Sequence, residues 1–323
     1  MQESRVPPAL VLFFLSPMIA ELLSGSAPPV EFFNPAGFLI LTSLYGSGAI
    51  VVRELVIRWD KGWTSLLILG AAYAILEEGL MVKSIFDPAW MDLGALATFG
   101  RWAGVNWVWA VMLTIYHATF SIAIPILLVE LMFSSRREFP WVGRKAFRLL
   151  VLLISVVAVI GFAWLTPYRP PIPQYLGAVA ATIALGYGAW KLPHQPKPRD
   201  WTRGPVGPRR LALFAFAATL CFFMLLYAGP FLTPFPIVMI VAAFCLVALV
   251  GMLLTDFGSR GLAESQEFAL AAGALGFLIL LAPLQEFDKT RTDNAVGMSL
   301  VGLSFLVFLV LLGRRIGRRS KVT

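Results

Sequence analysis

Apolar residues along this 323-residue chain gather in long runs, which alternate with short stretches rich in charge, proline and glycine. A helical run of roughly 17–25 apolar residues can cross the ~30 Å hydrocarbon core of a bilayer. The pattern therefore predicts ten candidate membrane-spanning helices. They cover residues 8–24, 36–57, 63–86, 105–133, 147–166, 174–191, 210–228, 233–255, 267–285 and 295–313.

The composition supports a protein that folds inside a membrane. Hydrophobic residues make up 59% of the chain and charged residues only 14%, with a mean hydropathy of +0.80. A chain this apolar does not fold in water. We expect an all-α, polytopic helix bundle in the cell membrane, with about ten transmembrane helices and membrane lipids as its surroundings.

The positions of Lys and Arg predict the orientation of the chain, because cytoplasmic connections of membrane proteins are enriched in both. If the N-terminus is inside, most of the 26 basic residues fall on inner connections and the C-terminal tail. Five fall on outer connections: Lys83, Arg101, Arg169, Lys289 and Arg291. Both termini are therefore predicted to be cytoplasmic. The net charge of +8 is divided among several loops, so we expect no nucleic-acid partner.

The ionisable residues are unevenly distributed, and this predicts three parts. Residues 1–167 form a five-helix half that carries nearly all the charges within spans, and 168–210 form a connection with the sixth helix and a Pro-rich basic linker. Residues 211–323 form a helical scaffold with a basic tail. We find no internal repeat, which disfavours a transporter with its site between two equivalent halves.

Two adjacent glutamates, Glu77 and Glu78, stand out because they lie inside the apolar run 63–86. Carboxylates are costly within a bilayer and by default mark a functional site. Such a pair can act as acid and base, or as metal ligands. The alternative is a purely structural hydrogen-bonded patch, paired with Lys83 or Arg101.

The next run adds His117, one of two histidines in the chain. At 100° per residue, Asn106, Thr114 and Ser121 lie near the same helix face, which indicates a face turned away from lipid. We therefore expect catalytic roles for Glu77, Glu78 and His117, and substrate contacts for the other three residues. The alternative for His117 is a neutral ring satisfied by a carbonyl or a hydroxyl group.

The polar, aromatic segment 87–106 is too polar to span the membrane and too long for a tight turn. It either lies in the interface or forms a lid over the glutamates. As a lid it would bring Trp90 and Arg101 to the substrate. It would also add Asp87 as a fourth candidate ligand, beside Glu77, Glu78 and His117, for a divalent metal.

Other polar and small residues are assigned simpler roles. Glu21 is at a comparable depth and could be a third carboxylate, while Glu54 and Glu130 are expected to be interfacial or ion-paired. Small residues permit close helix approach. The glycines assigned to packing are Gly46, Gly48, Gly186, Gly188, Gly273 and Gly276.

The stretch from Glu77 to Lys83, followed by Leu113 to His117, resembles the first two motifs of the CPBP family of intramembrane proteases, also called the CAAX protease or Abi family. Those motifs are E-E-x-x-x-R and F-x-x-x-H, and the likeness covers about forty residues. The resemblance implies that Glu77 activates water, with Glu78 and His117 beside it. This chain differs in having Lys83 one position late, Leu113 in place of Phe, and no second histidine in a later span.

Three functions follow as hypotheses. The first is an intramembrane hydrolase that uses a carboxylate-activated water on a lipid or peptide substrate within the bilayer. The second is a proton- or cation-coupled transporter of small solutes, which needs a polar path past Tyr116 or Ser121 and Glu130. The third is a non-catalytic subunit of a membrane complex. The clustering of polar residues on two neighbouring spans favours the hydrolase.

Overall fold

The computed structural model describes residues 6–194, 206–257 and 262–319, and most of the described chain is helical. Helical segments join end to end into long rods. In chain order the rods are α1 with η1 (Pro8–Pro17, Met18–Leu23), α3 with η2 and α4 (Pro35–Leu41, Thr42–Gly46, Ser47–Arg58), α5 with η3 (Trp63–Ile75, Leu76–Met81), α6 with η5 and α7 (Trp107–Tyr116, His117–Ala123, Ile124–Met132), α8 with η7 (Arg144–Ile160, Gly161–Leu165), α9 (Ile172–Lys191), α10 (Pro208–Leu232), α11 (Pro236–Phe257), α12 (Glu264–Phe287) and α13 (Met298–Arg319). The shorter elements are α2 (Pro29–Phe32), η4 (Met91–Leu96), η6 (Ser134–Arg136) and an antiparallel pair of two-residue strands, β1 (Arg101–Trp102) and β2 (Val105–Asn106).

The rods confirm the all-α membrane fold, and each predicted span coincides with one of them. Within the described ranges, eight helical stretches are long and apolar enough to cross a membrane. The rod Pro8–Leu23 is apolar but shorter, and α9 is not among the eight. The number of crossings and the cytoplasmic location of the termini remain predictions.

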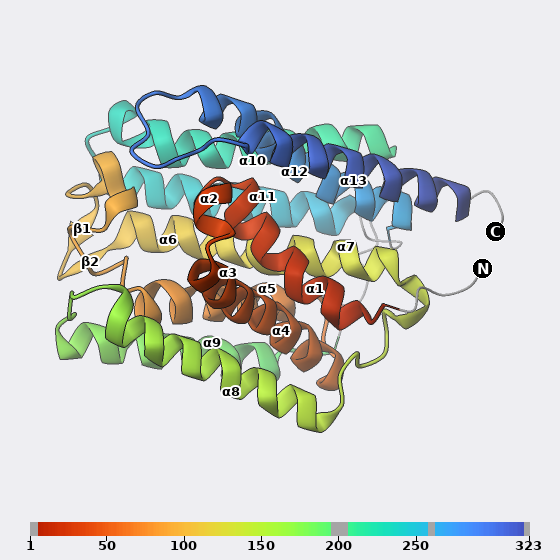
Figure 1. Cartoon of the computed structure of the whole chain (residues 1–323), viewed down its shortest axis with the longest axis horizontal. Coiled ribbons are helices and arrows are strands. Elements are labelled where there is room, and N and C mark those ends of the chain that lie inside the picture. Colours follow the sequence, from red (N-terminus) through yellow and green to blue (C-terminus); the bar gives the residue numbers. More distant parts are fainter. Residues whose placement is uncertain (1–5, 195–205, 258–261, 320–323) are drawn as a thin grey trace.

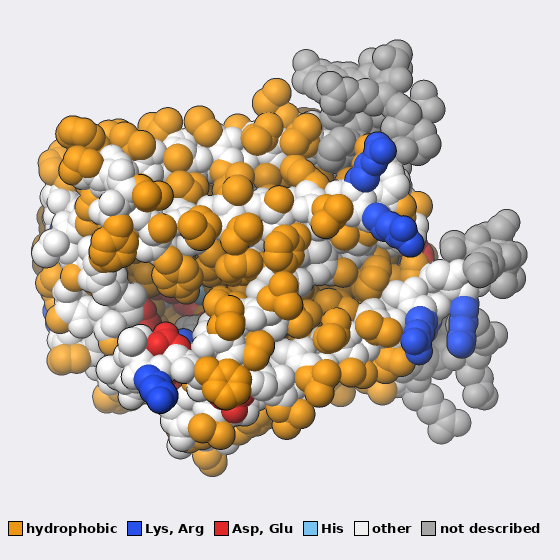
Figure 2. Space-filling model, turned by 90° about the horizontal axis from the view of Figure 1, so that it is seen from above, with side chains coloured by type: hydrophobic (Ala, Val, Ile, Leu, Met, Phe, Trp, Pro, Cys, Tyr) orange, Lys and Arg blue, Asp and Glu red, His pale blue; other side chains and the backbone are white. Residues whose placement is uncertain are grey.

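The rods run roughly along the long axis of the molecule (Figure 1). In this view α8 and α9 lie along one side and α10, α12 and α13 along the other, with α4 to α7 between them. The start of α1 and the end of α13 share one end, while β1 and β2 lie at the other. Figure 2 shows apolar side chains over the flank of the bundle, with most of the visible Lys and Arg at one end.

Burial differs between the rods, and it separates the centre of the bundle from its lipid-facing sides. In the most apolar part of Trp107–Met132, 67% of the residues are buried, and in that of Trp63–Met81 the share is 61%. The corresponding shares are 17% for Arg144–Leu165 and 11% for Pro236–Leu254. Among these membrane-length stretches, the α5 and α6 rods, which carry the two glutamates and His117, therefore have the largest buried shares.

The predicted three-part division remains a prediction. The connecting helix α9 packs along α5, and so lies beside the first half of the chain. Residues 195–205 of the proposed Pro-rich linker, and 320–323 of the basic tail, lie outside the described residues.

Three of the six glycines assigned to packing are at close contacts. A Cβ atom at Gly46 would lie 2.3 Å from the Phe13 carbonyl oxygen, and one at Gly273 would lie 2.1 Å from that of Ala212. At Gly48 it would meet the Tyr73 ring. At Gly276 the Cβ would be in ordinary contact with Phe216. The assignment is wrong for Gly186 and Gly188, where no described atom would lie within 4 Å of the Cβ.

Glu54 and Glu130 are ion-paired, as expected. They belong to an ionic network at one end of the bundle, the end at which α1 begins. Arg53, only 1% exposed, contacts Glu54 at 3.1 Å and Glu130 at 3.4 Å. Its guanidinium also lies 3.8 Å from the centre of the Trp141 ring. Arg137 joins Glu130, at 3.0 Å, to Glu267 of α12, at 2.6 Å. The network thus ties α4, α7 and α12 together.

We predict that Gly46→Ala destabilises the protein by about 1–3 kcal/mol, because the new methyl group would overlap the backbone of α1. Gly186→Ala is the matched control, since it adds the same methyl group in open space. Thermal unfolding in detergent measures both. Equal stability of the two variants would contradict the close approach of α1 and η2.

We predict a larger loss, about 3–5 kcal/mol, for Arg53→Ala, because it removes the buried guanidinium that Glu54 and Glu130 share, and leaves each carboxylate with one arginine only. The control is Arg148→Ala, which removes an exposed arginine from α8. The same unfolding measurement applies. A loss for Arg53→Ala no greater than that for the control would show that the network does not stabilise the bundle.

Candidate functional site

Glu77, Glu78 and His117 meet at the centre of the bundle. His117 Nε2 lies 2.9 Å from Glu78 Oε1, and Nδ1 lies 3.4 Å from Glu77 Oε2. All three side chains are buried, and one ligand atom from each lies within 4.8 Å of the others. The two glutamates of the α5 rod and the histidine of the α6 rod thus form the compact group that we expected.

Wide π-helical turns position this group. Glu21 lies in η1, Tyr45 in η2, both Glu77 and Glu78 in η3, and His117 in η5. A π-turn has more residues per turn than an α-helix and occurs frequently at functional sites. The wider turn brings the directions of neighbouring side chains closer together. Glu77 and Glu78 can therefore both reach the same imidazole ring.

The Glu77 side of the group includes two further residues. The Tyr45 hydroxyl contacts both Glu77 Oε1 and Glu21 Oε1. Glu21 is therefore joined to the site through Tyr45, as the third carboxylate anticipated from its depth. Three rods meet at this hydroxyl group.

The Glu78 side is fixed by neutral partners. The Ser84 hydroxyl donates to Glu78 Oε2 and accepts a hydrogen bond of 3.0 Å from the indole nitrogen of Trp109. Ser121, a predicted site residue, lies 2.9 Å from His117 Nδ1 through its hydroxyl oxygen. Every polar atom of Glu78 and His117 consequently has a partner.

Two buried oxygens in the group have no hydrogen-bond partner among the described residues: Glu77 Oε2 and the Tyr73 hydroxyl. The Tyr73 ring lies 6.0 Å from that of Tyr45 and 6.4 Å from that of His117, so both oxygens belong to the same cluster. A buried polar atom without a partner indicates a place for water or an ion. Two carboxylates and an imidazole are also donors that suit zinc and similar divalent ions. The residues therefore fit a metal.

Several residues predicted to join the site lie outside the group. Asn106 caps α6: its side chain accepts from the Trp109 amide at 3.0 Å and donates to the Leu96 carbonyl at 2.6 Å. An N-cap side chain folds back onto the helix start, so the shared face expected from helical spacing fails for Asn106. Thr114 is half-buried on α6.

The loop residues are also held elsewhere. Arg101 donates to the carbonyls of Ala97, Phe86 and Asp87. The Asp87 carboxylate accepts from the Ala89 amide, and Asp87 is not a member of the group that could hold a metal. Trp90 is half-buried at the start of η4. These contacts stabilise the loop itself.

Lys83 does not pair with the glutamates. Its ammonium group donates to the carbonyls of Phe162 at 2.8 Å and Thr166 at 3.1 Å, at the end of η7. Cations are favourable at the C-terminal end of a helix, where carbonyls lack partners. Lys83 therefore joins α8 and η7 to the end of η3.

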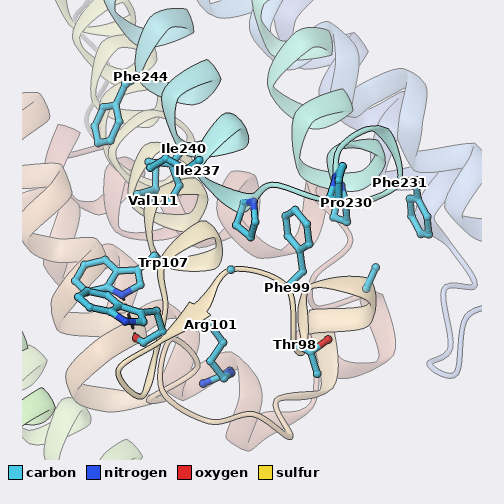
Figure 3. Close-up of a pocket in the computed structure, with 15 residues that line it drawn as sticks. Thr98, Phe99, Arg101, Trp107, Val111, Pro230, Phe231, Ile237, Ile240 and Phe244 are labelled. Atoms are coloured by element: carbon cyan, nitrogen blue, oxygen red, sulfur yellow. Dashed lines mark hydrogen bonds between the residues drawn. The ribbon is translucent and has the colours of Figure 1, made fainter.

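The loop that contains η4 approaches the site from one end of the bundle. The Leu96 carbonyl of η4 accepts from the Asn106 side chain at the start of α6, close to Trp109, which donates to Ser84 beside Glu78. On its other side the loop borders an apolar groove of about 960 Å³ against α10 and α11. Figure 3 shows Phe99, Ile237 and Ile240 around this groove, with the Arg101 side chain directed away from them.

Sequence reasoning missed Tyr45, Tyr73, Ser84 and Trp109 as members of the cluster. Tyr45 had a weak signal, because it lies in the small and polar stretch 42–48 within an apolar span. Nothing in the local sequence distinguishes Ser84, Trp109 or Tyr73 from ordinary core or loop residues.

Comparison with known proteins gives a family without an assigned activity. A protein of Archaeoglobus fulgidus, described as an uncharacterized protein, is 27% identical over 157 residues, which is 46% of this chain and 48% of that relative. The chain thus matches about half of the relative's length. No solved structure matches the chain. The model of an uncharacterized membrane protein family matches residues 10–319, nearly the whole chain, and the chain therefore belongs to that family.

Proposed function

We propose that this protein is a membrane-embedded hydrolase whose active site is the group of Glu77, Glu78 and His117. The observation that carries the proposal is the convergence of three buried ligand atoms within 4.8 Å, at the centre of a membrane helix bundle. Burying these groups is costly, and the cost is hard to explain without a function. The partial resemblance to the CPBP proteases supports the same chemistry.

Glu77 is the best candidate for the general base, because its Oε2 atom is the carboxylate oxygen of the group that accepts no hydrogen bond from any described residue. A water molecule there would give its proton to Glu77 while its oxygen attacks the carbonyl carbon of an ester or amide bond. When that bond breaks, the proton passes from Glu77 to the leaving oxygen or nitrogen. The substrate expected from the location is a lipid or peptide within the bilayer.

His117 and Glu78 would hold the reacting groups in place. Glu78 faces Nε2 and Ser121 faces Nδ1, so the ring cannot rotate without losing both contacts. A divalent metal bound by Glu77, Glu78 and His117 would supply Lewis acidity and lower the pKa of a bound water. Lys83 takes no part in this mechanism, since it is committed to η7.

A second candidate, a proton-coupled transporter, is favoured by one observation. Glu21, Tyr45, Glu77, His117, Glu78 and Ser84 form a series of polar contacts, and chains of this kind serve as proton relays in membrane proteins. Between Ser121 and Glu130, however, Ile122, Ile126 and Val129 are buried and apolar. The polar path that a transporter needs is interrupted there.

We predict that purified protein binds one divalent ion, and that Glu77→Gln and His117→Ala each lose it, because both remove a ligand. Metal analysis of the detergent-purified protein, combined with thermal unfolding, measures this. His194→Ala and Glu138→Gln are matched controls, since both residues are exposed. A metal-free wild type would contradict metal assistance and leave Glu77 alone as the base.

We predict that wild-type protein in liposomes, supplied with membrane lipids and peptides in ¹⁸O-enriched water, generates products that carry one ¹⁸O atom. Glu77→Gln should reduce their formation by about 10²-fold or more, which is typical for loss of a general base. Mass spectrometry detects the added isotope in any product, whichever lipid or peptide is cleaved.

Absence of ¹⁸O products, with proton uptake into vesicles that depends on Glu77, would replace the hydrolase with the transporter. Absence of both, with Glu77→Gln as stable as the wild type, would favour a non-catalytic subunit.

A further inference from the structure

The Tyr45 hydroxyl makes a hydrogen bond to Glu77 Oε1. The other oxygen of that carboxylate has the longer, 3.4 Å approach to His117 Nδ1. A carboxylate held at one oxygen presents its second oxygen in a defined direction. Tyr45 therefore determines where Glu77 Oε2 points.

The position of Tyr45 is itself fixed. Its side chain is 2% exposed, and its ring lies 6.0 Å from the His117 ring at an interplanar angle of 27°. Its hydroxyl also contacts Glu21, on a different rod. Packing and this second contact thus hold the hydroxyl where Glu77 meets it.

Glu21 in turn is anchored through the chain that follows it. The Ser24 carbonyl accepts from Gln285 of α12 at 2.7 Å, and the Gly25 carbonyl accepts from Arg291 at 2.7 Å. Contacts from the C-terminal part of the chain thus hold the end of the first rod. These contacts lie within four residues of Glu21 along the chain.

We propose that Tyr45 is the positioning residue of this site, and that Glu21 anchors its hydroxyl so that Glu77 Oε2 faces His117 Nδ1. The inferred orientation of the Glu77 carboxylate follows from these contacts and does not require the proposed function. Its consequence for catalysis rests on the proposed function, in which Glu77 Oε2 receives the proton. Residues that hydrogen-bond to the ligands of a site commonly fix the orientation of those ligands.

Tyr116 provides a matched control. Its ring also packs against His117, at 5.3 Å and 87°, but its hydroxyl donates to the Ala20 carbonyl at 2.6 Å. Tyr116→Phe therefore removes a buried hydroxyl beside the same imidazole, one that donates to the backbone of η1 and not to a carboxylate of the group. A difference between Tyr45→Phe and Tyr116→Phe isolates the carboxylate contact from general packing.

The test uses the histidine ring as the reporter. In the His194→Ala background, His117 is the one histidine of the chain, so ¹⁵N-histidine labelling gives two ring resonances. We predict that Tyr45→Phe shifts the Nδ1 resonance by more than its line width and moves Nε2, which faces Glu78, much less. Tyr116→Phe should leave Nδ1 in place. The full chain is measured in detergent with chelator, so neither metal nor substrate is needed.

An unchanged Nδ1 resonance in folded Tyr45→Phe would overturn the proposal, as would an equal shift in Tyr116→Phe. If Tyr45→Phe does not fold, Glu21→Ala replaces it and should shift the Nδ1 resonance in the same direction. Glu21→Gln keeps a polar partner for the Tyr45 hydroxyl and should therefore shift this resonance less. No effect of Glu21→Ala would then overturn the proposal. A shifted Nδ1 in a protein that yields no ¹⁸O products would refute the hydrolase and leave the positioning role standing.

Discussion

The contact between His117 and Glu78 is the interaction around which the centre of this bundle is organised. An ionisable side chain inside a bilayer must find polar partners, because lipid offers none. Here the partners come from separate rods: Glu78 from α5 and η3, His117 from the rod of α6 and α7, and Tyr45 from η2. The requirement to bring these groups together constrains which rods lie in the interior.

The remaining rods can be understood as the cover that this polar centre needs. The helices α8 and α11 are strongly apolar, and few of their residues are buried, as is usual for helices that face lipid. α9 packs along α5, and α10, α12 and α13 form a second packed group. The ionic network of Arg53, Glu54 and Glu130 then joins the central rods near one end, and Arg137 extends it to α12.

The two buried polar clusters solve the same physical problem differently. In the network around Arg53, acidic and basic groups face one another and backbone carbonyls complete the guanidinium contacts. The central cluster has three carboxylates, one imidazole and two buried oxygens without a hydrogen-bond partner among the described residues. Paired charges with satisfied hydrogen bonds suit a structural role, whereas an incompletely satisfied cluster suits a ligand or a reacting water.

The helices and the residues at the centre of the bundle could be predicted from the order of the amino acids alone. Apolar runs of sufficient length specify helical rods in a membrane, and carboxylates within them are conspicuous because they are costly, so Glu77, Glu78 and His117 were identifiable. The partners of these residues became apparent only in the folded molecule. Tyr45 and Ser84 meet the glutamates through π-turns and a chain reversal, and Asn106 turned out to cap a helix. Contacts between distant segments depend on how rods pack and where their turns widen, and neither property is encoded in the spacing of polar residues along one helix.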